Sequence, residues 1–127
     1  DVTHKVFLSD SDISKLSLMG NQTGKFLKNI SNYYINFYKE TKNMDGCFFH
    51  DATAVIAFTN PKLFEFKKGK VFVSKDDLTR GQTVVFDSHR VHETLPAGDR
   101  KNINIANDVN SEKVIFEFLE IAKNHMS

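Results

Sequence analysis

Cysteine is nearly absent from this sequence, which contains Cys47 alone among its 127 residues. A single thiol excludes an internal disulfide and a metal site built from several thiolates. It fits a reducing compartment, so the cytoplasm is the expected location. Tryptophan is missing altogether, and the twelve phenylalanines are expected to supply much of the aromatic volume of the core.

The sequence also lacks an excess of one charge and a long apolar run. Its 17 Lys and Arg residues are interspersed with 16 Asp and Glu residues, so we expect no nucleic-acid partner. Apolar runs such as Ala52–Phe58 are far shorter than the roughly 20 residues that cross a bilayer, so we expect no membrane span. A content of 40% hydrophobic and 26% charged residues is typical of a globular protein.

A long helix is the clearest element that the sequence predicts. Between Gly24 and Glu40 the apolar residues recur at spacings of three and four, the period of one helix face. Thr23 or Asn21 is expected to cap its start, and the polar stretch Asn43–Gly46 to end it. The apolar residues of this stripe are Phe26, Leu27, Ile30, Tyr33, Tyr34, Phe37 and Tyr38.

An imidazole and a carboxylate are adjacent at His50 and Asp51, where a loop is predicted to enter a short buried helix over Ala52–Phe58. Asp51 occupies the position of an N-cap, and the helix should end before Asn60-Pro61. The partial positive charge of a helix start keeps such a carboxylate ionised and leaves one oxygen free for a hard cation such as calcium. For an arbitrary His-Asp pair, a capping role alone would be the preferred interpretation.

Short strands dominate the second half of the chain. Apolar alternation on either side of Lys67–Lys70 predicts a hairpin over Phe64–Val73, and further strands are predicted at Gln82–Phe86 and Asn102–Val109. Asn110 should cap an amphipathic terminal helix. Helices alternating with strands predict the α/β class, but three or four short strands are too few for a complete covered sheet. We therefore expect another segment, fused or separate, to complete the fold.

A polar segment over Asp87–Lys101 has no apolar period and should form an exposed loop. Asp87, His89, His92 and Glu93 lie close together in it and could be taken for a metal site. A solvated loop lacks the rigid frame that metal ligands need, so the polar loop is the preferred interpretation.

Several segments, in order along the chain, resemble the inosine-uridine type nucleoside hydrolases. Phe49–Val55 resembles the family's His-Asp-Pro-x-Ala-Val motif, and Asp1–His4 resembles its Asp-Val-Thr-His stretch. Thr79–Val85 and Asn102–Val109 resemble two of its later strands. The resemblance implies that residues 1–127 are the C-terminal portion of a single α/β, Rossmann-like nucleoside hydrolase domain that is incomplete on its own. The first residue, Asp1 in place of Met, and the lack of a signal peptide pattern also suggest a cut.

The resemblance also implies a function, which is hydrolysis of the N-glycosidic bond of ribonucleosides. His50 matches the family's proposed general acid beside the leaving base, and Asp51 matches the aspartate that closes the Ca2+ coordination. Tyr34 and Tyr38 share a helix face and match aromatic residues that close over the base, with Tyr33 and Phe37 then expected to pack inward or at a neighbouring angle. An aromatic stripe at this spacing is, however, also typical of core packing.

Two departures from the family pattern matter. Ala52 replaces the usual proline, a mild change that leaves the ligand atom of Asp51 untouched. The family's N-terminal aspartate cluster has no counterpart in these residues, so the chain is expected to need the N-terminal half as a partner. Dimers or tetramers are implied as well. The alternative is a non-catalytic fragment that serves as a structural or assembly module.

Overall fold

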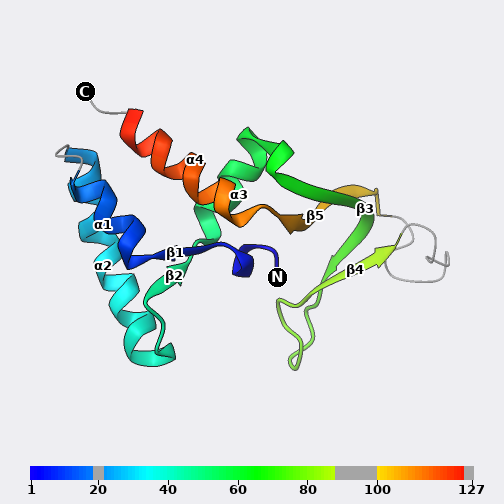
Figure 1. Cartoon of the computed structure of the whole chain (residues 1–127). Coiled ribbons are helices and arrows are strands. Elements are labelled where there is room, and N and C mark those ends of the chain that lie inside the picture. Colours follow the sequence, from blue (N-terminus) through cyan, green and yellow to red (C-terminus); the bar gives the residue numbers. More distant parts are fainter. Residues whose placement is uncertain (19–21, 88–99, 125–127) are drawn as a thin grey trace. The chain divides into compact units, whose positions relative to one another are not determined.

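The computed structural model describes residues 1–18, 22–87 and 100–124 (Figure 1). The chain forms two compact units, of which the first comprises Asp1–Phe64 with Asp108–Ser127 and the second comprises Glu65–Asn107. No helix in the described ranges combines the length and the apolar character that a bilayer span requires. The first unit contains the short 3-10 helices η1 (Thr3–Lys5) and η2 (Pro61–Leu63), strands β1 (Phe7–Ser9) and β2 (Gly46–Phe48), and helices α1 (Asp10–Leu18), α2 (Gln22–Lys42), α3 (His50–Thr59) and α4 (Ser111–Asn124).

Strands β1 and β2 form an antiparallel pair at the centre of the first unit. Leu8 lies opposite Cys47, and Ser9 lies opposite Gly46. Gly46 has a φ of 154°, and a Cβ atom there would collide with the Leu8 carbonyl oxygen and approach the Phe7 ring to 2.6 Å. Only glycine therefore allows the two strands to approach each other at this point.

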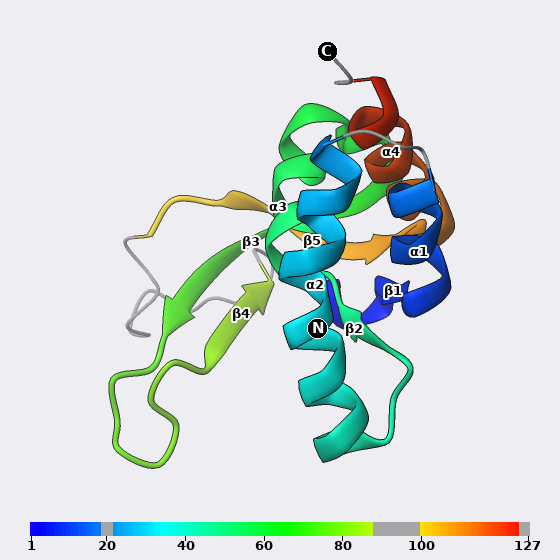
Figure 2. The same cartoon turned by 90° about the vertical axis from the view of Figure 1, so that its left-hand side faces the viewer.

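Helices α1, α2 and α4 pack around this strand pair. Figures 1 and 2 show α1 and α2 side by side, and the contacts between them are the most extensive between any two elements in the described chain. Apolar side chains from β1, β2, α1, α2 and α4 form one core. Burial of each large aliphatic side chain stabilises the fold by about 1.5–3 kcal/mol. Its buried members are Leu8, Ile13, Leu16, Ile35, Cys47 and Ala122.

Helix α1 and strand β1 were not predicted from the sequence. The start of α1 carries a capping box, in which the Ser9 hydroxyl accepts the Asp12 N–H at 3.1 Å and the Asp12 carboxylate accepts the Ser9 N–H at 3.4 Å. Partial burial raises the pKa of Asp12, but hydrogen bonds from Lys15 and Ser9 outweigh it and hold that pKa below its ordinary value. The ionised Asp12 carboxylate therefore stabilises the folded state at pH values above its ordinary pKa. This stabilisation is lost as the pH falls through the lowered pKa.

The long predicted helix is confirmed as α2, but its faces differ from the predicted stripe. Thr23 lies inside the first turn and does not cap it, and Asn21 is outside the described residues. Ile35 is the large apolar side chain that α2 buries. Tyr33, which was expected to pack inward or at a neighbouring angle, is 82% exposed, because two residues along a helix from Ile35 correspond to a turn of about 200°. Phe37 is 50% exposed for the same reason.

The predicted N-cap at Asp51 is wrong by two positions. Helix α3 begins at His50 with Phe49 as its N-cap residue, and no side chain caps the helix start. Asp51 therefore lies in the first turn, where its charge still interacts favourably with the helix dipole. The buried Thr53 hydroxyl donates to the Phe49 carbonyl group. As predicted, α3 ends before Pro61.

The predicted hairpin over Phe64–Val73 is also wrong, because these residues form one continuous strand, β3. Its partner is β4 (Thr83–Asp87), in antiparallel register, and β5 (Ile103–Val109) completes a sheet of order β4-β3-β5. Gly69 is not a turn residue. A Cβ atom there would lie 2.9 Å from the Phe86 carbonyl oxygen, so the glycine permits close approach of the neighbouring strand.

The actual turn between β3 and β4 spans residues 74–82. The Ser74 N–H donates to the Gln82 carbonyl group at 2.9 Å, and the Gly81 N–H donates to the Ser74 carbonyl group at 2.9 Å. Gly81 has a φ of 84°, in the left-handed region that glycine adopts readily. The sequence also predicted a turn at Gly81, 12 residues beyond Gly69, and this turn is confirmed as the one that joins the two strands.

The last strand and last helix are confirmed. The Asn110 side-chain oxygen accepts the Lys113 N–H at 3.1 Å, which is the predicted cap of α4. Asp87 ends β4, whereas His89, His92 and Glu93 of the predicted polar loop lie outside the described residues.

Replacement of Ser9 by Ala should lower the free energy of unfolding by about 1 kcal/mol, because it removes the N-cap of α1. The measurement is urea denaturation of the intact protein, followed by far-UV circular dichroism. Ser11→Ala is the matched control, since Ser11 is exposed in the same first turn. Equal stability of the two variants would contradict the capping role of Ser9.

Candidate active site

A hollow with a cavity volume of about 430 Å³ lies in the first unit, beside the start of α3. His50 and Asp51 from α3 line it together with Tyr34 from α2 and Phe48 from β2. The paired residues singled out in the sequence therefore share one cavity with one of the two tyrosines. Helix α3 brings the His-Asp pair there, and helix α2 brings the tyrosine.

His50 is held by two residues from the start of the chain. The Thr3 hydroxyl lies 2.7 Å from the Nδ1 atom of His50, within hydrogen-bond distance. The His4 ring packs edge-on against the His50 ring, with centroids 4.8 Å apart. Phe48 also packs against it at 5.9 Å. His50 is thus half-buried, with Nδ1 within hydrogen-bond distance of the protein, and the residue lines the hollow.

Asp51 is exposed at the wall of the same hollow. Its carboxylate has the chemistry of a calcium ligand, because calcium prefers six to eight oxygen donors and carboxylates are common among them. Within residues 1–18, 22–87 and 100–124, no group of three His, Cys, Asp or Glu side chains is arranged to hold a metal ion. The described residues therefore fit one ligand position of such a site and not a whole site.

Tyr34 and Tyr38 are neighbours on α2. Their ring centroids are 5.0 Å apart in an edge-to-face arrangement, and their hydroxyl oxygens are 3.4 Å apart. This hydrogen bond, with partial burial, raises the pKa of Tyr34 to about 12, so the phenol stays neutral at physiological pH. Tyr34 borders the hollow, whereas Tyr38 packs against Phe48 behind it at 5.7 Å.

Thr3 and His4 were not identified as site residues from the sequence. The Asp1–His4 stretch was noticed as a motif, but its distance of 47 residues from His50 gave no indication of contact. A backbone hydrogen bond from the Phe49 N–H to the Val6 carbonyl group, at 2.9 Å, brings the two segments together.

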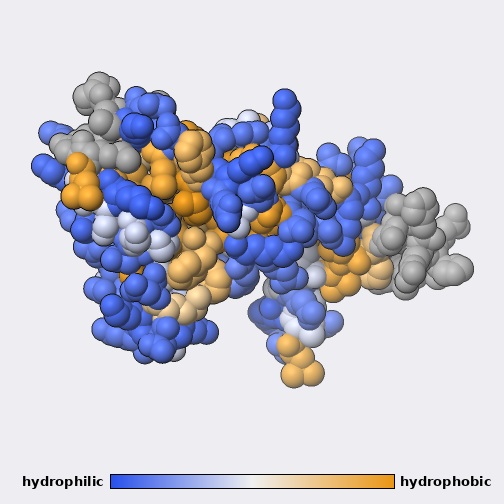
Figure 3. Space-filling view, viewed as in Figure 1, coloured by the Kyte–Doolittle hydropathy of each residue, from blue (hydrophilic) through white to orange (hydrophobic). Residues whose placement is uncertain are grey.

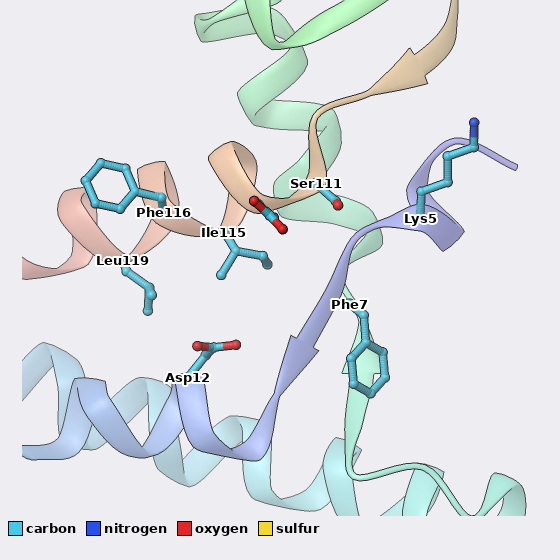
Figure 4. Close-up of a pocket in the computed structure, with 8 residues that line it drawn as sticks. Lys5, Phe7, Asp12, Ser111, Ile115, Phe116 and Leu119 are labelled. Atoms are coloured by element: carbon cyan, nitrogen blue, oxygen red, sulfur yellow. The ribbon is translucent and has the colours of Figure 1, made fainter.

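A second hollow, with a cavity volume of about 380 Å³, lies between α1, β1 and α4 (Figure 4). Figure 3 shows apolar surface on this face of the first unit, and Phe7, Ile115 and Phe116 contribute to the lining. Two of its charged groups have structural partners, since Lys5 pairs with Asp108 at 2.7 Å and Asp12 belongs to the capping box. No histidine is among the described residues that line it, so we place the candidate active site in the hollow beside His50.

Comparison with known proteins identifies the family. The family model described as "Inosine-uridine preferring nucleoside hydrolase" matches residues 1–115. The chain belongs to this family. The predicted α/β class is confirmed by the structure of a plant nucleoside hydrolase, PpNRh1, which matches with a TM-score of 0.87 and 26% identity over 98% of this chain and 39% of that chain.

Other nucleoside hydrolases match a similar region. "Probable uridine nucleosidase 2" of Arabidopsis thaliana is 25% identical over 116 residues, which are 91% of this chain and 36% of the relative. A purine-preferring ribonucleoside hydrolase from Gardnerella vaginalis has the same fold, with a TM-score of 0.78 and 24% identity over 97% of this chain and 37% of that chain. The chain thus spans little more than a third of the length of the nucleoside hydrolases that it matches.

Within the hydrolase fold, Cys47 is a packing residue and not a nucleophile. It is 4% exposed, and burial raises the pKa of its thiol. We expect iodoacetamide at pH 8 to label Cys47 much more slowly than a free thiol in the native protein, because the thiolate is the reactive species. In urea the labelling should become fast. Mass spectrometry of the peptide that contains Cys47 measures both rates, and fast labelling of the folded protein would contradict the burial.

Proposed function

We propose that the intact protein hydrolyses the N-glycosidic bond of ribonucleosides and releases ribose and a free base. The observation that carries this proposal is the shared hollow of His50, Asp51 and Tyr34 in a chain of the nucleoside hydrolase family. The relative described as a probable uridine nucleosidase and the matching plant nucleoside hydrolase support the same reaction. The proposal covers ribonucleosides as a class, since the matching relatives include a probable uridine nucleosidase and a purine-preferring hydrolase.

His50 acts as the general acid in this proposal. Cleavage of an N-glycosidic bond passes through an oxocarbenium-like state, in which the departing base needs a proton. Imidazole titrates near neutrality and can deliver one. The position of His50 on the wall of the hollow, half-buried and oriented by Thr3, suits a group that must meet the base at a fixed angle.

Asp51 supplies one oxygen ligand to a Ca2+ ion in this proposal. When bound, calcium would hold the ribose diol and polarise the attacking water. Asp51 suits that role because it is exposed at the wall of the hollow and lies in the first turn of α3, where the helix dipole attracts negative charge. The remaining ligands are expected from the N-terminal half of the domain.

Tyr34 and Tyr38 provide an aromatic wall for the base. Tyr34 reaches the hollow directly and can stack on a nucleobase, while Tyr38 fixes its ring from behind. A neutral phenol is suited to this contact, because a charged one would have to lose its hydration on binding.

The rest of the domain is the proposed partner of this chain. The outer face of α2 exposes large apolar side chains, namely Phe26 at 61%, Ile30 at 52% and Tyr33 at 82%. A face of this kind is typical of a surface that another segment covers. We propose that residues 1–127 are part of one domain, that the whole protein forms homo-oligomers, and that it works in the cytoplasm.

A non-catalytic role as an assembly module is the alternative. It is favoured by the single carboxylate, Asp51, that the described residues bring to the hollow. Intact-mass analysis under denaturing conditions distinguishes the two. An added segment with an aspartate-rich stretch is expected for the enzyme, and its absence would favour the module.

Replacement of His50 by Ala in the intact protein should lower kcat more than it raises KM, because a general acid acts mainly in the transition state. Loss of general acid catalysis should reduce the hydrolysis of natural nucleosides by about 10²–10⁴-fold. A p-nitrophenyl riboside leaves as a stabilised anion and needs little proton assistance, so its turnover should stay almost normal. Steady-state kinetics on both substrates make the comparison. Equal losses on both would assign His50 a positioning role.

Replacement of Asp51 by Ala should reduce the hydrolysis of both substrates, because the metal serves each of them. It should also weaken Ca2+ binding by about tenfold or more, since the number of charged ligands sets calcium affinity. Isothermal titration of the metal-free protein with Ca2+ provides the second readout. Asp45→Ala is the matched control, because Asp45 is an exposed carboxylate outside the hollow. Unchanged calcium affinity in the Asp51 variant would exclude a ligand role.

A further inference from the structure

Thr3 contacts His50 through a hydrogen bond between side chains, and not only through apolar packing. Its hydroxyl oxygen lies 2.7 Å from Nδ1 of His50, and within the described ranges it is the only hydrogen-bond partner of that ring. Thr3 is half-buried, so few water molecules compete for this hydrogen bond. We propose that Thr3 is a positioning residue, which accepts the Nδ1–H of His50 and thereby makes Nε2 the nitrogen that delivers the proton to the leaving base.

The backbone around Thr3 is fixed independently of the side chain. Thr3 begins η1, and its carbonyl group accepts the Val6 N–H at 3.2 Å. The Val6 carbonyl group then accepts the Phe49 N–H at 2.9 Å, one residue before His50. Residue 3 is thus held next to residue 50 by main-chain contacts, and the hydroxyl group can be removed without releasing the segment.

The other neighbours of His50 restrict its ring without binding its nitrogens. His4 meets the ring edge-on at 4.8 Å, and Phe48 packs against it at a tilt of 43°. Ring contacts of this kind limit rotation but do not distinguish Nδ1 from Nε2. The Thr3 hydroxyl makes that distinction, because the hydrogen bond at one ring nitrogen determines the role of the other.

The direction of the hydrogen bond follows from the proposed reaction, on which this inference rests. An imidazole that donates a proton carries hydrogen on both nitrogens, so Nδ1 must donate and the Thr3 oxygen must accept. In the step itself the Nε2–H bond breaks and the proton goes to the base. The electron pair of the C1′–N bond leaves with the base, and the ring keeps its hydrogen on Nδ1. Thr3 therefore accepts the same N–H before and after the step, and no rearrangement is needed.

Three variants of the intact protein test this role through kinetics. Thr3→Val keeps the shape but loses the hydroxyl, and it should lower kcat on natural nucleosides by about 10–100-fold with little change in KM, as for other residues that orient a functional histidine. Thr3→Ser keeps the hydroxyl and should restore most of the rate. Thr59→Val is the matched control, because Thr59 is exposed at the far end of α3 and should leave the rate unchanged.

Two further comparisons separate positioning from a merely structural effect. Thr3→Val should leave p-nitrophenyl riboside turnover nearly normal, and it should cause no additional loss in a protein that already carries His50→Ala, since it acts through that ring. Equal losses on both substrates, or a full additional loss in the His50→Ala protein, would overturn the proposal. If His50→Ala itself shows no substrate dependence, the proposed function of His50 fails, and that result is visible without any Thr3 variant.

A spectroscopic measurement tests the hydrogen bond between Thr3 and His50 independently of enzyme activity. ¹⁵N NMR of the histidine-labelled protein, at a pH where the ring is neutral, should show the His50 hydrogen on Nδ1, and Thr3→Val should shift the ring towards a mixture of tautomers. The His50→Ala protein assigns the signal. Hydrogen on Nε2 in the wild-type protein, or a tautomer unaffected by Thr3→Val, would overturn the proposal.

Discussion

The antiparallel pairing of β1 with β2 is the contact on which the rest of the first unit depends. It places Leu8 against Cys47 in the core, and through the Phe49 N–H to Val6 carbonyl hydrogen bond it continues to the start of α3. The pairing is possible because Gly46 has no Cβ atom to collide with the Leu8 carbonyl oxygen. Both the core and the candidate active site follow from this one approach of two strands.

Helix geometry gives the neighbouring residues His50 and Asp51 different surroundings. Successive side chains on a helix point about 100° apart, so His50 and Asp51 cannot face the same way. His50 turns towards η1, where Thr3 and His4 contact its ring. Asp51 remains exposed at the wall of the hollow. One helix start thus offers an imidazole that is oriented by protein and a carboxylate that is exposed at the hollow.

Helix α2 shows what a local pattern can and cannot determine. Its apolar period predicted the helix and the proximity of Tyr34 and Tyr38. Both features depend only on the spacing of residues along the chain. The elements packed against α2 decide which of its faces is buried. Ile35 is buried, whereas Tyr33 is exposed. Gly69 is a similar case, because a glycine between lysines signals a turn in a sequence, yet in the sheet it accommodates a neighbouring strand.

The sequence by itself determined the α/β class, the terminal helix with its Asn110 cap, and the pair His50 and Asp51 at a helix start, because each depends on residues close together in the chain. It missed α1 although Ser9 and Asp12 form its capping box, since that signal is short and no strong apolar period follows it. Tertiary structure alone decided that Thr3 and His4 meet His50. That contact joins residues 47 positions apart, and such contacts are set by strand pairing and not by any local preference.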